Sequence, residues 1–405
     1  MSLAVTLAGC VAAPDTTALP PGAGAGPPTG DLVGRHGGST VALLAPVTGA
    51  NAAIGEALVK AAQLALSSPG SPPLDVRDTG STPQGAAQAA QAAIAAGDGI
   101  IIGPLSGPET AAVARPASAA GVAVLAFTND SSQARPGVWT LGITPVQQVR
   151  RMVGAEAAQG KTRFAALLPD TEFGHAMGNA LNEATQQAGG SAQVQYHNDS
   201  NAGIAAGMKE ISGYASRRGP IDAQIKAARQ GHDADARRKA QELANQGVPP
   251  ADFDALLLAD TGEKLAWLAT FIPYYDLNSV QIMGPLLWAQ PAARAGGAVS
   301  GAWFAAPDPA LRGSFNDAYS AKYGVAPPNI ADLAYDAALI ARVAASEGGF
   351  TTEALTRQQG FSGTDGVLAL QPDGRVRRGL ALFQIQRGGS QIIEPAPGSL
   401  SAPGI

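Results

Sequence analysis

Short runs of consecutive apolar residues alternate with longer Ala-rich stretches along most of this sequence. This alternation limits the possible fold more than any other feature. Examples of the runs are "TVALLAP" (40–46), "GIIIGP" (99–104) and "FDALLLAD" (253–260), and a stretch with helical character follows each. Apolar residues that do not alternate with polar ones are typical of parallel strands buried on both faces. The pattern therefore predicts an α/β protein with parallel sheets covered by helices.

Two segments that lie far apart in the chain repeat the same pattern. "VALLAPVTGANAAIGEALVKA" (41–61) is matched by "FAALLPDTEFGHAMGNALNEA" (164–184), and both have a Pro and a Gly at the same separation. Each copy reads as a strand, a Pro-ended polar loop and a helix. The spacing of the copies is too long for a solenoid repeat. It instead predicts two doubly wound lobes, each opening with its own strand-loop-helix unit.

The later part of the chain sets the expected division between these lobes. The helix expected at 331–345 should return to the first lobe, and "PDGR" between two β-like runs predicts a hairpin. A long excursion near the middle reads as two exposed helices broken at Gly231. We therefore expect lobe 1 at 39–143 plus 307–348, lobe 2 at 144–306 plus 349–395, a helical insertion at about 212–250, and a flexible tail at 396–405.

The N-terminal residues indicate a secretory segment. The only cysteine, Cys10, follows "SLAVTLAG", and "LAGC" resembles the lipobox of bacterial lipoproteins. That resemblance implies cleavage before Cys10 and lipidation of its sulfur. The apolar run is short and no Lys or Arg precedes it, so we interpret 1–10 as a truncated signal. Residues 11–38 are rich in Pro and Gly and predict a disordered tether, which leaves the lipid as the only membrane attachment.

Composition and motifs exclude several classes of function. The net charge of −5 and the pI near 5.4 argue against nucleic acid as a partner. The four histidines are scattered, and the sequence has no H-E-x-x-H, paired Cys/His or G-x-S-x-G pattern. We therefore expect no enzymatic activity, no metal site and no cofactor.

Polar side chains cluster in the loops that follow the expected strands. In open parallel sheets, ligands bind outside the carboxyl ends of the strands, where helix N-termini present free N–H groups. Hydroxyl, amide and carboxyl groups in these loops suit a small polar or zwitterionic ligand. The candidate ligand-binding residues are Thr48, Asn51, Ser106, Gly107, Thr128, Asn129, Asp170, Phe173 and Asp260.

Ser106 has two interpretations that the sequence leaves open. In "SGPE" its hydroxyl and Glu109 have the spacing of a capping box, which would stabilise the following helix by about 1 kcal/mol. The same hydroxyl and the N–H groups beside it could instead receive a ligand carboxylate. The two roles can coexist.

The ordered set of segments resembles the type I periplasmic solute-binding proteins, in particular the leucine/isoleucine/valine-binding group. The resemblance runs over about 39–395 and is carried by "VALLAPVTGANAAIGEALVKAAQLAL", "IIGPLSGPETAAVARPASAAGVAVLAFTND", "LLPDTEFGHAMGNAL", "FDALLLAD", "AYSAKYGVAPPNIADLAYDAALI" and "FSGTDGVLALQPDGRVRRG". It implies two parallel-sheet lobes that are joined by crossover strands and close on a ligand, with Thr128 holding an α-amino acid and Phe173 covering it. The same fold occurs in lipoprotein activators of penicillin-binding proteins, and "FIPYYD" and the insertion are closer to that subgroup.

Two departures from the amino-acid binders bear on the ligand. They usually carry a second hydroxyl where this chain has Gly107, and an acid after the strand that matches "VQIMGP", where this chain has "LLWAQ". A buried ligand ammonium without a counter-charge costs several kcal/mol. Asp170, Glu172 or Asp260 would have to replace that acid.

Two functions therefore stand. The first is a lipid-anchored periplasmic receptor that closes on a small polar, amino-acid-like ligand for an ABC-type permease. The second is an activator of a penicillin-binding protein that regulates peptidoglycan synthesis by protein contact, for which a peptidoglycan fragment is a further ligand candidate. Ser106, Thr128 and Asn129 favour the first, and the two departures favour the second.

The insertion carries an excess of basic residues on an acidic protein. We interpret it either as a solvated excursion or as a docking surface for an acidic partner or anionic polymer. Its charged residues are Arg217, Arg218, Lys226, Arg229, Arg237, Arg238 and Lys239 against Asp222, Asp233, Asp235 and Glu242.

Overall fold

The computed structural model describes residues 38–231, 233–294 and 297–401. The expected signal segment with Cys10 and nearly all of the expected tether lie outside the described residues, as do 402–405 of the expected tail.

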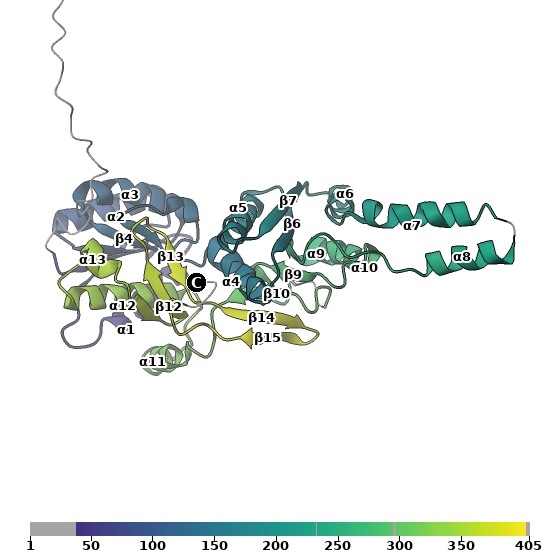
Figure 1. Ribbon diagram of the computed structural model, residues 1–405. Coiled ribbons are helices and arrows are strands. Elements are labelled where there is room, and N and C mark those ends of the chain that lie inside the picture. The colour runs from purple at the N-terminus through teal and green to yellow at the C-terminus, as the bar shows by residue number, and fades with distance from the viewer. Residues whose placement is uncertain (1–37, 232, 295–296, 402–405) are drawn as a thin grey trace, which may run out of the picture. The chain divides into compact units, whose positions relative to one another are not determined.

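The first sheet is parallel and has the strand order β2-β1-β3-β4-β5. Helices cover both faces: α2 and α3 pack on one, and α1 and α12 pack on the other (Figure 1). This covering explains why runs such as "VALLA" are apolar at every position. The elements are β1 (Val41–Ala45), α1 (Ala52–Ala65), β2 (Leu74–Asp78), α2 (Pro83–Ala96), β3 (Ile100–Ile102), α3 (Gly107–Ala120), β4 (Ala123–Ala126), η1 (Ser131–Gln133), β5 (Val138–Thr140), α11 (Gly313–Tyr323), α12 (Ala331–Ser346) and α13 (Thr352–Leu355).

Helix α2 shows how local chemistry sets the ends of the Ala-rich helices. The Thr82 hydroxyl accepts a hydrogen bond from the N–H of Gly85 at 3.0 Å, and Pro83 occupies the first helical position. Pro is well suited there because that N–H has no partner within a helix. Gly97 ends the helix with a φ of 83°, a left-handed conformation that glycine adopts without strain.

The second sheet repeats the topology of the first. Its parallel strands follow the order β7-β6-β8-β9-β10, which corresponds strand by strand to β2-β1-β3-β4-β5. The two-lobe doubly wound fold predicted from the sequence repeat is thereby confirmed. Antiparallel β14 and β15 extend one edge. The elements are α4 (Pro145–Ala158), β6 (Arg163–Pro169), α5 (Glu172–Gln187), β7 (Ser191–His197), α6 (Asn201–Ile211), β8 (Ala255–Leu258), α9 (Gly262–Ala269), α10 (Phe271–Tyr274), β9 (Gln281–Gly284), η2 (Leu286–Ala289), β10 (Trp303–Ala306), β14 (Ala381–Gln386) and β15 (Gly389–Glu394).

A small antiparallel sheet of β11 (Phe361–Gly363), β12 (Gly366–Leu370) and β13 (Val376–Arg378) contains the expected hairpin at "PDGR". Its apolar side chains belong to the core of the first lobe. The expected division, which gave all of 349–395 to lobe 2, therefore differs from the packing. Up to Arg378 the segment contacts lobe 1, and only β14 and β15 join the second sheet. Leu368 and Leu370 point into a cluster already formed by α12, which the β-like pattern alone does not specify.

The insertion forms two helices, α7 (Tyr214–Ala228) and α8 (Ala234–Ala244), as expected. They contact each other and extend as a hairpin beyond α6 (Figure 1). We call residues 214–244 the helical hairpin. At its base, the Arg217 guanidinium donates to the carbonyl oxygens of Ser212, Pro249 and Tyr275.

Candidate functional site

The loops after β1 and β2 contact each other in the first lobe. Thr48 donates its N–H and its hydroxyl to the carboxylate of Asp78, and the N–H of Asn51 donates to the Ser81 hydroxyl at 3.1 Å. Burial raises the pKa of Asp78, but hydrogen bonds from Thr48 and Gly80 outweigh this and leave it below its usual value. These loop groups already have partners within the protein.

The start of α3 carries the capping box expected from "SGPE". The Ser106 hydroxyl accepts from the Glu109 N–H at 3.4 Å and donates to Glu109 Oε2 at 2.7 Å. The Ser106 N–H also donates to Glu109 Oε2, at 3.0 Å. The capping interpretation of Ser106 is confirmed, and both polar groups of this residue are directed at Glu109.

A second carboxylate lies against the same helix start. A Cβ added to Gly107 would be 2.8 Å from Oδ2 of Asp130, so a side chain at position 107 would displace this carboxylate. Hydrogen bonds from Ser132 and Gln133 hold Asp130 in place. Burial raises its pKa, but these bonds outweigh burial and keep the pKa below its usual value, so the group is ionised near neutrality. The sequence analysis did not single out Asp130.

Thr128 and Asn129 sit at the carboxyl end of β4, as expected. Thr128 is buried and its Oγ1 accepts from the N–H of Asp130 at 3.1 Å, whereas Asn129 is exposed. Gly142 packs closely here, because an added Cβ would lie 2.6 Å from the Asn129 nitrogen. The loops bearing Gly107, Thr128 and Gly142 are therefore neighbours in the first lobe.

In the second lobe, Asp170 and Phe173 lie in the loop and first turn after β6. Asp170 is exposed and pairs with His175 at 2.8 Å, and His175 lies 4.1 Å from the Tyr196 ring. Phe173 is half-buried and packs against the apolar cluster of α4, α5 and the sheet. Phe173 therefore contributes to packing, whereas the family resemblance implied that it covers a ligand.

Asp260, at the carboxyl end of β8, is buried in a pair with His197 at 3.0 Å. His197 Nδ1 faces the carbonyl of Asn198 at 2.9 Å and must donate there, so Nε2 can donate to Asp260 only when the ring is protonated. Burial lowers the pKa of His197, but Asp260 and Asn198 outweigh burial and raise it above its usual value. The carboxylate expected to face a ligand is paired with the His197 imidazole.

The acid that amino-acid binders carry after the strand matching β9 is absent from "LLWAQ". Trp288 packs against the end of β9 instead. The indole is buried, donates from Nε1 to the carbonyl of Asp260 at 2.9 Å, and lies directly over Gly284.

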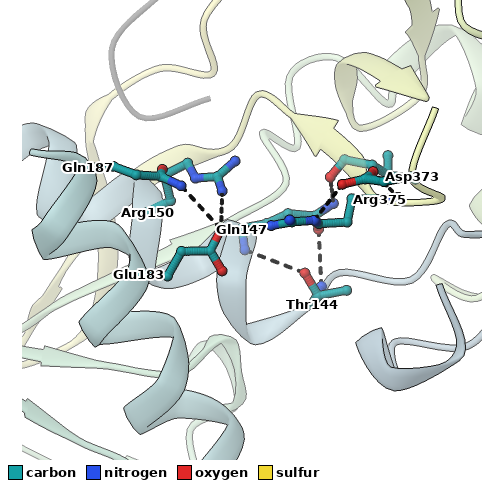
Figure 2. A network of polar contacts seen from close by, with 8 residues as sticks. Thr144, Gln147, Arg150, Glu183, Gln187, Asp373 and Arg375 are labelled. Atoms are coloured by element: carbon teal, nitrogen blue, oxygen red, sulfur yellow. Dashed lines mark hydrogen bonds and ion pairs between the residues drawn. The ribbon is translucent and has the colours of Figure 1, made fainter. Parts of the chain in front are cut away.

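A network that the sequence analysis missed connects the second lobe to the hairpin turn of the small sheet (Figure 2). Oε1 of Glu183 accepts from Arg150 at 3.1 Å and from Arg375 at 2.8 Å, and Arg375 also pairs with Asp373. Gln147 in the first turn of α4 donates to the carbonyl of Val376 at 2.6 Å. All of these residues except Glu183 border a pocket of about 170 Å³. The sequence gives no sign of this pocket, because Arg150 and Arg375 come close together only in the folded chain.

A buried charged cluster lies near the same crossovers. Arg378 is fully buried, donates to the carbonyl of Leu141 at 2.9 Å, and lies 3.5 Å from Asp365 and 3.8 Å from Asp336. Burial raises the pKa of Asp336 to about 7, with Arg378 acting against the rise and Asp365 adding to it. The cluster is buried and is therefore not an accessible site.

An aromatic surface lies on α9 and α10, close to the base of the helical hairpin. Trp267 and Tyr274 are 41% and 68% exposed, and the Phe271 ring lies between them at 5.3 and 6.4 Å. We call Trp267, Phe271 and Tyr274 the aromatic surface. Large exposed aromatic groups are uncommon on a free surface and are enriched in protein interfaces.

The described residues contain no group of three or more His, Cys, Asp or Glu side chains placed to hold a metal ion. Within the same ranges, every helix is too short or too polar to cross a membrane.

A family model with the description "Periplasmic binding protein" matches residues 39–390. The chain belongs to the periplasmic binding protein family. This family comprises solute-binding and regulatory proteins, and the resemblance to its leucine-binding type noted in the sequence is confirmed.

Solved structures of periplasmic binding proteins share the fold at low identity. A putative branched-chain amino acid ABC transporter protein of Rhodospirillum rubrum has a TM-score of 0.64 at 20% identity, covering 88% of this chain and 100% of that one. The leucine binding protein LivK of Thermotoga maritima has a TM-score of 0.52 at 18% identity, with 87% and 97% covered. No curated protein matches the chain by sequence.

The fold is also shared by a regulatory protein. The LpoA C-domain from Haemophilus influenzae, described as a regulator of PBP1A, has a TM-score of 0.59 at 19% identity, covering 88% of this chain and 100% of that domain. Against full-length LpoA the match spans 59% of that protein. At these identities the likeness shows the fold alone.

Proposed function

We propose that this periplasmic binding protein regulates a peptidoglycan synthase by protein contact and does not hold an amino acid at the start of α3. The observation that carries the proposal is the pair of protein carboxylates, Glu109 and Asp130, at that helix start. A helix N-terminus is where this fold would receive a ligand carboxylate. Here Glu109 accepts from the N–H and the hydroxyl of Ser106, and the Asp130 carboxylate lies against Gly107.

The available donors at this position are few. The N–H and hydroxyl of Ser106 both donate to Glu109 Oε2, and Pro108 has no N–H. Asp130 lies against Gly107. An incoming carboxylate would meet two acidic side chains and would have to break hydrogen bonds, each of which contributes about 1 kcal/mol. Occupancy by a zwitterion is therefore disfavoured.

The second lobe supports the same conclusion for the ligand ammonium. Asp260 is paired with His197, and Trp288 stands where an acid would be needed. Asp170 is exposed to solvent and pairs with His175. An ammonium buried here would lack a free counter-charge, at a cost of several kcal/mol.

The helical hairpin and the aromatic surface supply a contact site for a protein partner. Lys226, Arg229 and Lys239 are exposed on the hairpin, on a protein whose net charge is −5. Basic side chains on the hairpin, together with exposed Trp and Tyr near its base, fit an acidic protein surface, because interface anchors are enriched in Trp, Tyr and Arg. The fold shared with the LpoA C-domain, a regulator of PBP1A, supports a synthase as the partner.

Binding of the full chain to the purified synthase of the same organism tests the proposal. The double variant Lys226→Glu/Arg229→Glu should raise the Kd for the synthase about tenfold, because it reverses charges that steer association. The increase in Kd should be larger at low salt, where charges are screened less. Arg115→Glu/Arg387→Glu reverses two exposed arginines elsewhere and should leave binding unchanged. Equal affinity of both double variants and the unmodified chain would refute the hairpin as the contact site.

Solute capture for an ABC-type permease is the second candidate. The repeated strand order favours it, since both sheets retain the switch points where this fold binds ligands. A thermal-shift panel of amino acids and peptidoglycan fragments separates the two functions. A true ligand at about 100 times its Kd would stabilise the fold by about 2.7 kcal/mol. A rise in Tm with an amino acid would support capture and count against the regulatory proposal.

We also propose that the protein is lipid-anchored in the periplasm through Cys10, on the strength of "LAGC". Metabolic labelling with a palmitate analogue should mark the protein in cells and should be lost in Cys10→Ser. Labelling that persists in this variant would contradict the anchor.

A further inference from the structure

We propose that a buried cluster of charged side chains holds together the segments that join the two lobes, and that it releases them when it loses a proton. The cluster contains three carboxyl groups and two guanidinium groups, and we call it the hinge cluster. Its members are Asp332, Asp336, Asp365, Arg312 and Arg378. The three acids and Arg378 are buried. The inference does not depend on the regulatory role proposed above.

Within the described residues, the chain passes between the lobes three times, and the hinge cluster reaches all three crossovers. These are 141–144 between β5 and α4, 307–312 between β10 and α11, and 379–380 between β13 and β14. Arg378 directly precedes the third crossover and donates to the carbonyl of Leu141 in the first, at 2.9 Å. Arg312 ends the second crossover and donates from Nε to both oxygens of Asp332, at 2.9 and 2.7 Å.

Asp365 connects these contacts with one another. Its carboxylate lies 3.5 Å from Nη1 of Arg378, and Asp336 lies 3.8 Å from the same nitrogen. Asp365 also raises the pKa of Asp332 through its charge and a hydrogen bond, so the two carboxyl groups are neighbours. Because Asp332 binds Arg312, the contacts run without a break from the second crossover to the first and third.

The hinge cluster has one more carboxyl group than it has guanidinium groups. A buried carboxylate that lacks a cation of its own is unfavourable, so one of the three acids should keep its proton. The contacts of Arg378 with Asp336 and Asp365 add to this need. Nη1 of Arg378 and Oδ2 of Asp336 are buried and have no hydrogen-bond partner among the described residues, so the guanidinium neutralises these acids only in part.

The titration of the acids agrees with this count of charges. Burial raises the pKa of Asp332 and of Asp336 to about 7, the paired guanidinium groups oppose the rise, and Asp365 adds to it. Tyr335, on the same helix, is a further titratable group beside Asp336. Groups that interact this closely titrate as a unit, so the proton belongs to the cluster. Because an exposed Asp has a pKa of about 3.9, the stability that this proton gives is fully present below about pH 4 and is lost as pH rises through about 7.

Loss of the proton should therefore loosen the crossovers. The deprotonated cluster carries a net negative charge in a buried place, and separation of its members would let water reach the carboxylates. An opening that returns one acid to its ordinary pKa releases one proton, and it becomes about tenfold more populated between about pH 6 and about pH 8. Two-lobed proteins move about a few such connecting residues. In this chain, pH would thus act on the motion of the lobes.

Amide exchange of the full chain at about pH 6 and about pH 8, corrected for the pH dependence of the intrinsic exchange rate, tests the inference. Protection at the crossovers should fall about tenfold between the two pH values. The hydrogen-bonded N–H groups that report it are those of Leu141, Gly142, Leu311 and Gly379. Exchange times are chosen at which β1 and β6 stay protected at both pH values, so that the measurement reports local opening.

Variants of the hinge cluster should remove this pH dependence. Asp336→Asn leaves two carboxylates with two guanidinium groups, so no proton is needed and protection should be the same at both pH values. Asp332→Asn changes the count in the same way and gives a second measurement. Asp317→Asn, at an exposed position on α11, is the matched control and should keep the tenfold fall.

A fall in protection that either cluster variant abolishes and Asp317→Asn retains supports the inference. Equal protection of the crossovers at both pH values in the unmodified chain would overturn it. The same fall in Asp336→Asn and Asp332→Asn as in the unmodified chain would also overturn it, because the proton would then be held elsewhere.

Discussion

The Glu183 carboxylate lies 2.8 Å from the Arg375 guanidinium, although the two residues are 192 positions apart in the sequence. Glu183 also accepts from Arg150, so one side chain on α5 holds both α4 and the β12–β13 turn. The contact therefore links helices of the second lobe to a turn of the small sheet, whose strands pack in the first lobe.

Glu183→Gln should loosen the β12–β13 turn. The pairs with Glu183 are partly exposed, so we expect a loss of about 0.5–1 kcal/mol in the free energy of unfolding. Amide exchange in 371–377 should become faster because the turn loses its link to α5. Glu210→Gln, at an exposed position on α6, is the control and should change neither measurement. Unchanged exchange in 371–377 would contradict the role of Glu183.

Gly107→Ser should be destabilising because its Cβ would lie 2.8 Å from Asp130 Oδ2. We expect a cost of about 1–3 kcal/mol, typical of overpacking at a tight contact. Asp130→Ala in the same chain should recover part of that cost, since the space is then free. A double-mutant cycle by chemical denaturation measures the coupling. Strictly additive effects would show that the two residues do not compete for the space.

Asp336 should make stability fall as pH rises. Its pKa in the folded protein is about 7, above the unfolded value of about 3.9, so the folded state binds more protons between these values. The resulting stability is fully present below about pH 4 and is lost as pH rises through about 7. Arg378, Asp365 and Asp332 are the charged groups around it, and burial also raises the pKa of Asp332 to about 7.

Denaturation curves at about pH 5 and about pH 8 test this dependence. One such proton contributes at most about 1.4 kcal/mol per pH unit between the two pKa values. Asp336→Asn should reduce the difference between the two curves, because position 336 no longer titrates. Asp317→Asn, at an exposed position on α11, should leave it unchanged. The same slope in Asp336→Asn as in the unmodified chain would rule out Asp336 as its source.

Asp260→Asn should lower the pKa of His197. The carboxylate at 3.0 Å is the main group that opposes the effect of burial on this imidazole. The raised pKa stabilises the fold below about pH 6.5, and this contribution is lost as pH rises through the folded value. Imidazole NMR shifts during a pH titration give the pKa directly, with Asp170→Asn as the comparison. An unshifted His197 would mean that Asn198 and the surrounding backbone determine the titration.

The features that could be predicted from the sequence are those set by nearby residues or by a repeated pattern. The Ser106–Glu109 capping box spans one helical turn, so its residue types were sufficient to predict it. The "VALLA" and "FAALL" runs predicted matching strands, because burial on both faces forces every position to be apolar. The helix expected at 331–345 in the first lobe corresponds to α12, which packs in the core of that lobe.

The features that the sequence did not indicate depend on contacts between distant segments. Asp130 reaches Gly107 only because β3 and β4 are neighbours in the sheet. Asp260 appeared available to a ligand until His197, on the other side of β6, was placed beside it. Residues 361–378 have a β-like pattern that fits either lobe, and the packing of Leu368 beside α12 decided between them.

Arg217 determines how the helical hairpin is attached. Its guanidinium holds carbonyl oxygens from before α7, from after α8 and from the end of α10, at 3.1, 2.6 and 2.6 Å. These three hydrogen bonds hold the base of the hairpin. We therefore expect the hairpin to move as a rigid body rather than to bend where it leaves the second lobe. We also expect a displacement of the far end of the hairpin to shift Tyr275, to which Arg217 is bonded, and the aromatic rings that contact it.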